Sequence, residues 1–490
     1  LFYYGLFSAF GLNPLPFRIA SVLVHLFSSI LVFYVVSRFT EKKELGLFTA
    51  LLFATSWLNS QAVCWLTAVH EVLWPFFGLL TVVCLYQFRH KGGLLYYGLS
   101  LVCLLLAMGS KENAFVLPGV LLLVDWYYRG VEWSPMGILL DLRDGLRRGP
   151  VLAILPFFAL ALMHFLILKR SSAVWGAGLG GDVEVHNLMN LGRTFHGFYD
   201  DLTYAFGVPF VVRGKYIVNS GITTLSITAL VYLFTSEENR RRITLLMASL
   251  LVLILPLSFL GTALHYISCL TVVSLTLSVL VLYEGSGLVA ERLARKAPVW
   301  LTKAVIAYGI FFSLYGALLV WNYRFVHQTA GYYHRMGNVV RSFLNTLEDS
   351  FPKGDLKKEK LLLVNFPRLI EPPFWPRFTL TRAVIWDNIE VPLAVHLGKD
   401  CLPTISLVSV PLDDEKLYGK WKAYEKRKPH KKRKPYDNEV LFTKDITLEE
   451  FDILSKDKNH RVYFFNLADE SIREVTGYDH TGLQKLLILR

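Results

Sequence analysis

The chain has 490 residues, 53% of them hydrophobic and 18% charged, with a formal net charge of +12. A soluble protein usually carries about 25% charged residues, and a single core in water rarely grows beyond roughly 250–300 residues. The composition therefore excludes one soluble globular domain. The five cysteines form no CxxC pair, which argues against a disulfide framework and against a thiolate zinc site.

The long apolar runs are concentrated in residues 1–325. A transmembrane helix needs about 20 mainly apolar residues, and helices are expected because lipid offers no partners to open backbone groups. We therefore predict a mainly α, polytopic membrane domain. Its expected transmembrane helices are ten in number, at 17–37, 46–62, 69–88, 94–110, 113–129, 150–168, 217–234, 243–260, 264–283 and 302–321.

Residues 190–212 differ from these ten segments because they include Arg193 and Asp200. Charged side chains are costly in lipid. We expect this stretch to form a re-entrant or interfacial helix on the outer side of the membrane.

Positive charges are concentrated in alternate connections between the apolar segments. Cytoplasmic loops carry the excess of Lys and Arg, so these connections are predicted to face the cytoplasm, and everything after residue 322 is predicted to face outside. This use of positive charge argues against nucleic acid as a partner. The residues concerned are Arg38, Lys42, Lys43, Arg89, Lys91, Arg129, Arg143, Arg147, Arg148, Arg240, Arg241, Arg242, Arg292, Arg295 and Lys296.

The pattern changes after a connecting helix expected at 326–354. The sequence there predicts a small extracytoplasmic α/β domain over 355–490, with one helical run at 446–454. Its β-type runs, separated by polar turns, are expected at 360–367, 383–388, 404–410, 439–445 and 461–467. Its segment 417–436 is strongly basic and contains two prolines. Either this segment is a solvated insertion, or it contacts anionic lipid or a polyanionic glycan.

Four ionisable residues lie at the outer ends of the early helices: His70 and Glu71 in one cluster, and Lys111 and Glu112 in another. A charge at membrane depth costs at least about 2.5–3.5 kcal/mol unless it is paired or hydrated. Their common level indicates a shared water-filled cavity. The alternatives are an interfacial Glu71, an interfacial or core His70, and a Lys111–Glu112 pair that caps adjoining helices and extends to the interface.

Three short motifs carry a resemblance to a known family. They are NPLPFRIASVLVHLFSSIL (13–31), NSQAVCWLTAVHEVLW (59–74) and GSKENAFVLP (109–118). In this order they resemble membrane glycosyltransferases of the GT-C superfamily, in particular the protein O-mannosyltransferase-like enzymes and their bacterial relatives. The resemblance covers residues 1–325 at the level of architecture.

The resemblance implies transfer of a sugar, with inversion, from a polyprenyl-phosphate-linked donor to a protein, lipid or envelope-glycan acceptor. Lys111 would stabilise the phosphate leaving group, Glu71 would orient the acceptor or a cation, and Glu112 would pair with Lys111. Further implied substrate-binding residues are His70, Trp65, Arg193 and His265.

Two departures from the family pattern concern the donor site. The chain begins inside an apolar stretch, so the first helix, and the first outer loop that would carry the general base, are expected to precede Leu1. Relatives often have an Arg-Tyr pair before a late helix, whereas this chain has His265-Tyr266. Histidine binds phosphate electrostatically only when it is protonated.

No cofactor is firmly predicted. In the GGDVEVHN stretch, Asp182, Glu184 and His186 alternate in an outer loop. Oxygen and imidazole ligands suit a divalent metal, and the alternative is a solvated loop.

No N-x-S/T site occurs in the chain. This favours a prokaryotic source, so we expect a multi-pass protein of the bacterial cytoplasmic (inner) membrane, in contact with membrane lipids. The competing hypothesis for function is a non-catalytic transporter or scaffold with an extracytoplasmic binding domain. Transporters often contain internal repeats, and no convincing repeat is present.

Overall fold

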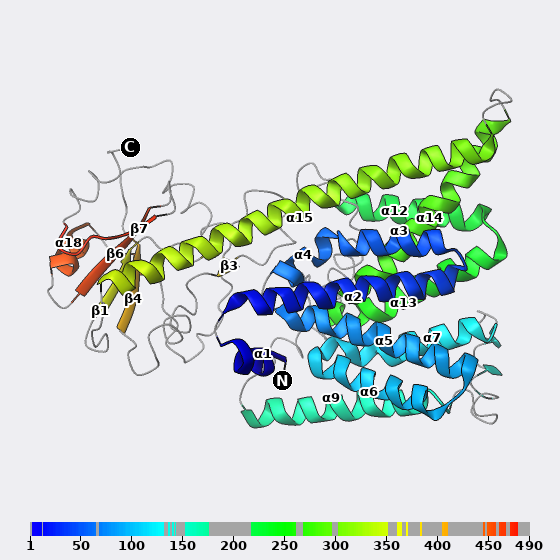
Figure 1. Ribbon diagram of the computed structural model, residues 1–490, viewed down its shortest axis with the longest axis horizontal. Helices are drawn as coiled ribbons and strands as arrows, with labels where there is room; N and C mark the ends of the chain where they lie inside the picture. Colours follow the sequence, from blue (N-terminus) through cyan, green and yellow to red (C-terminus); the bar gives the residue numbers. More distant parts are fainter. Residues whose placement is uncertain are drawn as a thin grey trace. The chain divides into compact units, whose positions relative to one another are not determined.

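The structure is a computed structural model, and it describes part of the chain (Figure 1). The described residues are 2–11, 13–64, 68–131, 136–137, 140–141, 143, 152–175, 217–260, 268–295, 302–350, 360–364, 369–370, 383–384, 404–409, 444–445, 448–456, 460–466 and 471–478. The chain divides into two compact units, Leu1–Ala330 with Phe374–Thr379, and Gly331–Pro373 with Leu380–Arg490.

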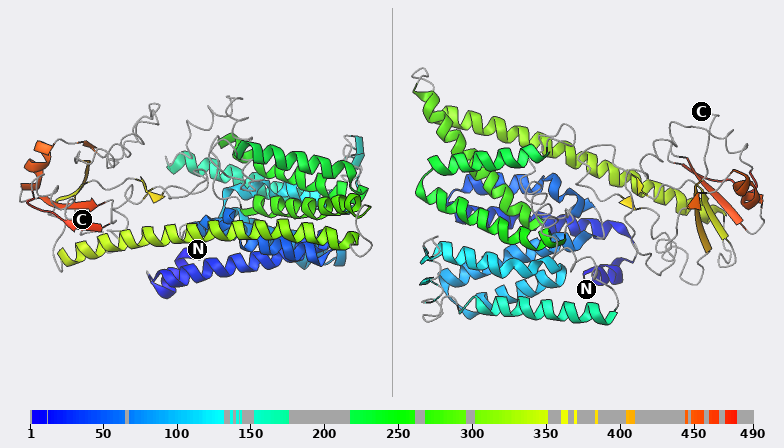
Figure 2. Two further views of the ribbon diagram at one scale, coloured as in Figure 1. Left: turned by 90° about the horizontal axis from the view of Figure 1, so that it is seen from above. Right: turned by 180° about the vertical axis from the view of Figure 1, so that it is seen from behind.

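The first unit is a bundle of helices whose axes run in roughly the same direction (Figure 2). Short helix α1 (Phe2–Phe10) precedes it in the sequence. The described helices that follow are α2 (Pro14–Thr40), α3 (Lys43–Ala54), α4 (Trp57–Cys64), α5 (Val69–Lys91), α6 (Leu94–Ser110), the 3-10 helix η2 (Glu112–Val116), α7 (Leu117–Tyr128), α9 (Leu155–Trp175), α12 (Ile217–Phe234), α13 (Glu237–Leu260), α14 (Ser268–Ala294) and α15 (Lys303–Ser350). The residues of α15 from Gly331 onward belong to the second unit.

Helix α2 shows how the sequence defines such a helix. Asn13 caps its start by accepting a hydrogen bond from the Leu15 amide at 3.0 Å, and Pro14 occupies the first helical position. Its hydroxyl groups donate back to carbonyls four residues earlier, as Ser28 does to Val24 at 2.8 Å. These bonds satisfy polar groups inside an apolar segment.

The turn between α2 and α3 requires a close helix approach. A side chain at Gly46 would place its Cβ 2.0 Å from Ser37 Oγ and 2.8 Å from the Phe33 carbonyl oxygen. Only glycine fits there, because the second obstacle is backbone. The two helices therefore pack tightly against each other from their connecting turn onward.

Each of the ten predicted segments overlaps a helix, but only some of these helices have the length and hydropathy needed to cross a membrane. Among the described residues, four helices are long and apolar enough to cross a membrane, or five if the bent pair α3–α4 is one span. The four are Pro14–Thr40, Val69–Lys91, Cys269–Ala294 and Lys303–Gln328. Shorter apolar helices are Leu94–Ser110, Asn113–Tyr128, Leu155–Ile167 and Thr224–Phe234.

The predicted single helix at 46–62 is instead two helices. Helices α3 and α4 meet at an angle of 44°. The chain bends where the Thr55 amide still bonds to the Leu51 carbonyl, and the Ser56 side chain then accepts a hydrogen bond from the Leu58 amide. A serine oxygen that receives the first amides of a new helix acts as an N-terminal cap.

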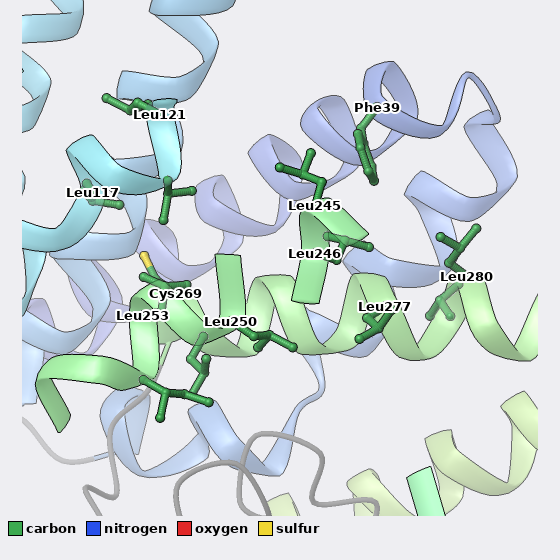
Figure 3. Packing of buried hydrophobic residues seen from close by; sticks show 14 of the residues in the cluster. Phe39, Leu117, Leu121, Leu245, Leu246, Leu250, Leu253, Cys269, Leu277 and Leu280 are labelled. Carbon is green, nitrogen blue, oxygen red and sulfur yellow. The ribbon is translucent and has the colours of Figure 1, made fainter. Parts of the chain in front are cut away.

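The core of the bundle contains the large aliphatic side chains of α7, α13 and α14, joined by Phe39 of α2 (Figure 3). Leu250 and Leu277 are fully buried there. Equally apolar side chains lie on the outside, including Leu162 at 60% and Leu233 at 69% exposure. An apolar exterior around an apolar core is what a lipid environment favours, and the long apolar helices identify a membrane protein.

The second unit contains a five-stranded sheet in the order β5-β4-β1-β6-β7. Strands β1 (Lys360–Val364), β4 (Thr404–Ser409), β5 (Lys444–Asp445) and β6 (His460–Asn466) are parallel, and β7 (Ser471–Glu474) pairs antiparallel with β6. Helix α18 (Leu448–Lys456) lies between β5 and β6 in the sequence, and β2 (Leu369–Ile370) pairs with β3 (Ala383–Val384). Each of the five β-type runs predicted from the sequence contains a strand.

Replacing Leu250 of α13 by alanine should lower the free energy of unfolding by about 2–5 kcal/mol, because it leaves a cavity in a fully packed site. The matched control is Leu251→Ala on the next residue, which is 45% exposed on the outside of the bundle and should change stability little. Thermal unfolding in nanodiscs measures both. Equal losses would contradict the packing of α13.

Candidate functional site

A buried ion pair joins the start of α5 to the end of α6. The Glu71 carboxylate is 1% exposed, and its Oε1 lies 3.0 Å from Lys111 Nζ, whose side chain is 16% exposed. Glu71 lies in the first turn of α5, where the free backbone amides favour a negative charge. The antiparallel α5–α6 hairpin brings these two residues together although they are 40 positions apart in the sequence.

His70 makes a second contact with the same carboxylate oxygen. Its Nε2 lies 3.4 Å from Glu71 Oε1, and its side chain is 40% exposed. When His70 is protonated, Glu71 is shared by two cations. The pair Glu71–Lys111 together with His70 is called the Glu71 cluster below.

The backbone of Lys111 is hydrogen-bonded on both sides. The Lys111 amide donates to the Ala107 carbonyl at 3.0 Å, which ends α6, and the Lys111 carbonyl accepts from the Ala114 amide at 3.1 Å. Lys111 itself is extended, with φ −148° and ψ 132°. The lysine therefore stands at a tight corner between α6 and η2, and its backbone is fixed on both sides.

Polar groups also line the neighbouring helix α4. Asn59 is 2% exposed and donates through Nδ2 to the Phe53 carbonyl at 3.0 Å. The Trp57 amide donates to Asn322 Oδ1 of α15 at 3.1 Å. These bonds tie α4 to α3 and to α15 at one end of the bundle, which we call the site end.

An apolar cavity of about 120 Å³ lies deeper in the bundle, between α2, α5, α7, α13 and α14. Gly78 lines it, together with Leu117 and Cys269. Gly78 is seven residues after Glu71, so it lies on the same face of α5 and about 10 Å along the helix. The Glu71 cluster is thus followed, two helical turns further along α5, by a recess that suits a small apolar group.

A second charged network lies at the opposite end of α5, about 27 Å from Glu71 by helical rise. Asp125 of α7 is bound by Arg89 and by Arg129, each at 2.8 Å. Arg129 also donates from Nη1 and Nη2 to the two carboxylate oxygens of Asp141, at 2.6 and 2.8 Å. This hydrogen bonding holds the pKa of Asp141 below its ordinary value.

Other predicted cytoplasmic residues gather at that same end, which we call the basic end. Lys42 lies 3.6 Å from Glu284 of α14. Arg242 of α13 pairs with Glu238 and lies 3.9 Å from Glu41. Positive residues from four different connections therefore meet, and the carboxylates among them stabilise the bundle.

The structure brings three of the predicted site residues together: His70, Glu71 and Lys111. Glu112 opens η2, and its side chain lies outside the described part of the structure, so the predicted Glu112–Lys111 pair stays a prediction. Trp65, Arg193 and His265 lie outside the described residues, as do Asp182, Glu184 and His186. No group of three or more metal-ligating side chains occurs among the residues that the structure describes.

Sequence reasoning did not single out Asp125 or Asn322. Asp125 had a usable signal, because it is an acid inside the apolar run LLLVDWYY. Asn322 had none, because its partner is an amide 265 positions away.

No protein-family model, no curated protein and no solved structure matches this chain.

Lys111→Met should lower the free energy of unfolding by about 3–5 kcal/mol, because it removes a cation from a buried carboxylate. In a double-mutant cycle with Glu71→Gln, the two changes should couple by more than about 1 kcal/mol. Lys91→Met, at the exposed end of α5, is the matched control and should have little effect. A coupling free energy near zero would show that the pair contributes nothing.

Proposed function

We propose that this chain is a GT-C-like integral membrane glycosyltransferase. It transfers a sugar, with inversion, from a polyprenyl-phosphate-linked donor to a protein, lipid or envelope-glycan acceptor on the extracytoplasmic face. The observation that carries the proposal is the buried Glu71–Lys111 pair placed two helical turns from an apolar cavity. An anionic head and an apolar tail in one ligand match these two features.

Lys111 is assigned to the leaving group. The acceptor hydroxyl attacks the anomeric carbon, the bond from that carbon to the phosphate oxygen breaks, and the electron pair leaves with the phosphate. Charge develops on that oxygen, and an ammonium in a water-poor site stabilises it more strongly than water does. The hydroxyl proton passes to a carboxylate base.

Glu71 is assigned to positioning and not to proton abstraction. Its Oε1 is already bound by Lys111 and contacted by His70, and the carboxylate is buried. Held in this way, the carboxylate keeps Lys111 in orientation. His70, which is partly exposed, adds positive charge for a phosphate when it is protonated.

The charge distribution supports the orientation. The basic end collects Lys42, Arg89, Arg129 and Arg242, and positive ends of membrane bundles face the cytoplasm. The Glu71 cluster at the other end of α5 then faces the extracytoplasmic side. In this proposal the chain is a protein of the bacterial inner membrane, and the second unit is an extracytoplasmic α/β domain that docks the acceptor.

Lys111→Ala should reduce the release of polyprenyl phosphate by at least about tenfold, since one charge-assisted contact to the leaving group is worth roughly 1.5–3 kcal/mol. The assay uses the full chain in nanodiscs with polyprenyl-phosphate sugars. Lys111→Arg keeps the charge and should retain part of the rate, and Lys91→Ala is the control at the basic end. Unchanged turnover in Lys111→Ala would refute the role of this lysine.

A second test distinguishes binding of the polyprenyl tail in the cavity from the effect of the Lys111 charge. Ser249 lines the cavity, so Ser249→Leu should fill it and raise the KM for a polyprenyl-linked donor about tenfold or more, with a smaller effect on a short-chain analogue. The matched control is Ala248→Leu, which extends into a different groove between α12 and α13. Equal effects on both donors would refute tail binding in this cavity. Binding of donor without any release would favour the transporter or scaffold.

A further inference from the structure

An open groove runs between α12 and α13. Its volume is about 570 Å³, which lies within the range of about 300–1,000 Å³ that is usual for pockets that hold small molecules. Ala229 and Leu251 on its walls are exposed, so the groove opens to the outside of the bundle. It shares no lining residue with the inner apolar cavity. Its walls include Leu225, Ala229 and Tyr232 of α12 and Thr244, Met247 and Leu251 of α13.

The groove forms because α12 packs against α14. A Cβ atom added at Gly285 of α14 would lie 3.4 Å from Val231 Cγ2, so the two helices approach closely there. One turn further along α12, Thr235 donates to Glu284 Oε2 at 3.4 Å. Val231 and Thr235 are four residues apart and lie on one face of α12. This face is held against α14, and a different face is left open toward α13.

The walls of the groove offer few hydrogen bonds to an occupant. Thr228 and Thr244 both line it, but each hydroxyl donates to a carbonyl of its own helix. Thr228 donates to the Thr224 carbonyl at 2.8 Å, and Thr244 donates to the Arg240 carbonyl at 2.9 Å. These bonds use the hydroxyl protons. The walls therefore suit a hydrocarbon chain.

The length of the groove corresponds to one leaflet of a membrane. From Ile243 to Leu251, which both line it, the helical rise amounts to about 12 Å. The hydrocarbon core of a bilayer is about 30 Å thick, so one leaflet contributes roughly 15 Å. A single acyl chain of one leaflet therefore matches the groove.

Two arginines lie at the basic end of the groove. Arg240 is exposed and lies one turn before Thr244 on the same face of α13, so it continues the wall of the groove. Arg292 of α14 lies 5.9 Å from the ring centroid of Phe234, the last residue of α12. Among the residues that the structure describes, neither arginine belongs to an ion pair.

The two arginines that follow Arg240 in the sequence have partners inside the bundle. Arg242 is buried and pairs with Glu238. Arg241 lies over the ring of Tyr127 of α7, at 5.9 Å from its centroid. Of the three consecutive arginines, Arg240 is therefore the one that follows the wall of the groove.

The charges at this end favour an anionic headgroup. Glu237 is exposed and opens α13, one turn before Arg240. Together with Arg240 and Arg292 it leaves two positive charges and one negative charge, a local excess of +1. One phosphodiester neutralises this excess, whereas a headgroup that also carries an ammonium would restore it. Basic residues at the surface of a membrane attract anionic lipids.

We propose that the groove between α12 and α13 binds an anionic phospholipid of the leaflet at the basic end. One acyl chain lies in the groove, and Arg240 and Arg292 hold the phosphodiester. Tyr232 then lies at the level of the headgroup, where tyrosine is common in membrane proteins. The phosphate belongs to a lipid and not to a soluble anion, because the walls next to the arginines are apolar. The inference does not rest on the proposed sugar transfer, which is assigned to the site end.

The first test measures binding of phosphatidylglycerol to the full chain in detergent micelles by native mass spectrometry. Arg240→Gln/Arg292→Gln should raise the Kd at least about tenfold. The matched control, Arg38→Gln/Lys91→Gln, removes the same charge from exposed positions of α2 and α5 at the same end, and should stay within about twofold. Equal increases in both variants would overturn the inference, because they would show general attraction of lipid to the basic end.

The apolar part of the site has its own variant. Ala229→Leu extends a side chain into the groove and should raise the Kd about tenfold or more. The matched control is Ser226→Leu, at an exposed position of α12 that does not line the groove, and it should stay within about twofold. Both positions are exposed, so neither change disturbs the core. An unchanged Kd in Ala229→Leu would refute binding in the groove.

Two other ligands test the choice of occupant. Phosphatidylcholine should bind at least about tenfold more weakly than phosphatidylglycerol, and the difference should shrink in high salt. Glycerol 1-phosphate has the phosphate without the acyl chains and should not compete. Equal affinities for the two lipids would refute selection by charge, and competition by glycerol 1-phosphate would assign the arginines to a soluble anion.

A photolabel provides a readout on the unmodified chain. Phosphatidylglycerol with a diazirine in its acyl chain, in nanodiscs, should label the groove residues Met247 and Leu251 in preference to Leu162 and Leu233, which are exposed outside the groove. Uniform labelling would contradict the site. Lys111→Ala should leave the Kd for phosphatidylglycerol unchanged, and a loss of binding in this variant would contradict the independence of the lipid site from the Glu71 cluster.

Discussion

A carboxylate buried in an apolar bundle is stable only next to a cation, and this constraint fixes both ends of α5. At the site end Glu71 pairs with Lys111 and contacts His70. At the basic end Asp125 pairs with Arg89 and Arg129. Removing either carboxylate's partner would expose a charge to a medium of low polarity, where the penalty amounts to several kcal/mol. The two pairs therefore set the register of α5 against α6 and α7, and the apolar core between them fills the space that this register leaves.

Much of the helical architecture follows from the spacing of apolar residues, because a long apolar run in lipid has only the helix available to satisfy its backbone. The level of His70, Glu71 and Lys111 also followed from the sequence, since short connections place consecutive helix ends at one side of the membrane. The contact between Glu71 and Lys111 did not follow from the sequence. It depends on the rotation of α5 against α6, which local sequence does not encode.

The break between α3 and α4 shows a second limit of sequence reasoning. Apolar periodicity continues through Thr55 and Ser56, so the run predicts one helix. The bend of 44° arises from a serine cap and from the pairing of the Trp57 amide with Asn322, which lies on α15. A helix can end wherever its free amides find partners, and a partner 265 positions away is invisible to any local pattern. The strands of the second unit were easier to predict from the sequence, because the alternation of side chains and the flanking turn residues are local signals.

The choice of cation distinguishes the two ends of the bundle chemically. At the basic end the planar guanidinium of Arg129 donates two hydrogen bonds to Asp141 and one to Asp125. Such a fixed geometry stabilises protein structure and leaves a guanidinium little freedom to turn toward an incoming anion. Lys111 at the site end is a compact ammonium on a flexible stem, and an ammonium can be shared between two anions without the loss of a bidentate geometry. In the reaction we propose, a phosphate that approaches Lys111 would gain a contact while Glu71 keeps its own. The same proposal favours a lysine over an arginine at this position, because an ammonium can follow the charge that develops on the leaving oxygen.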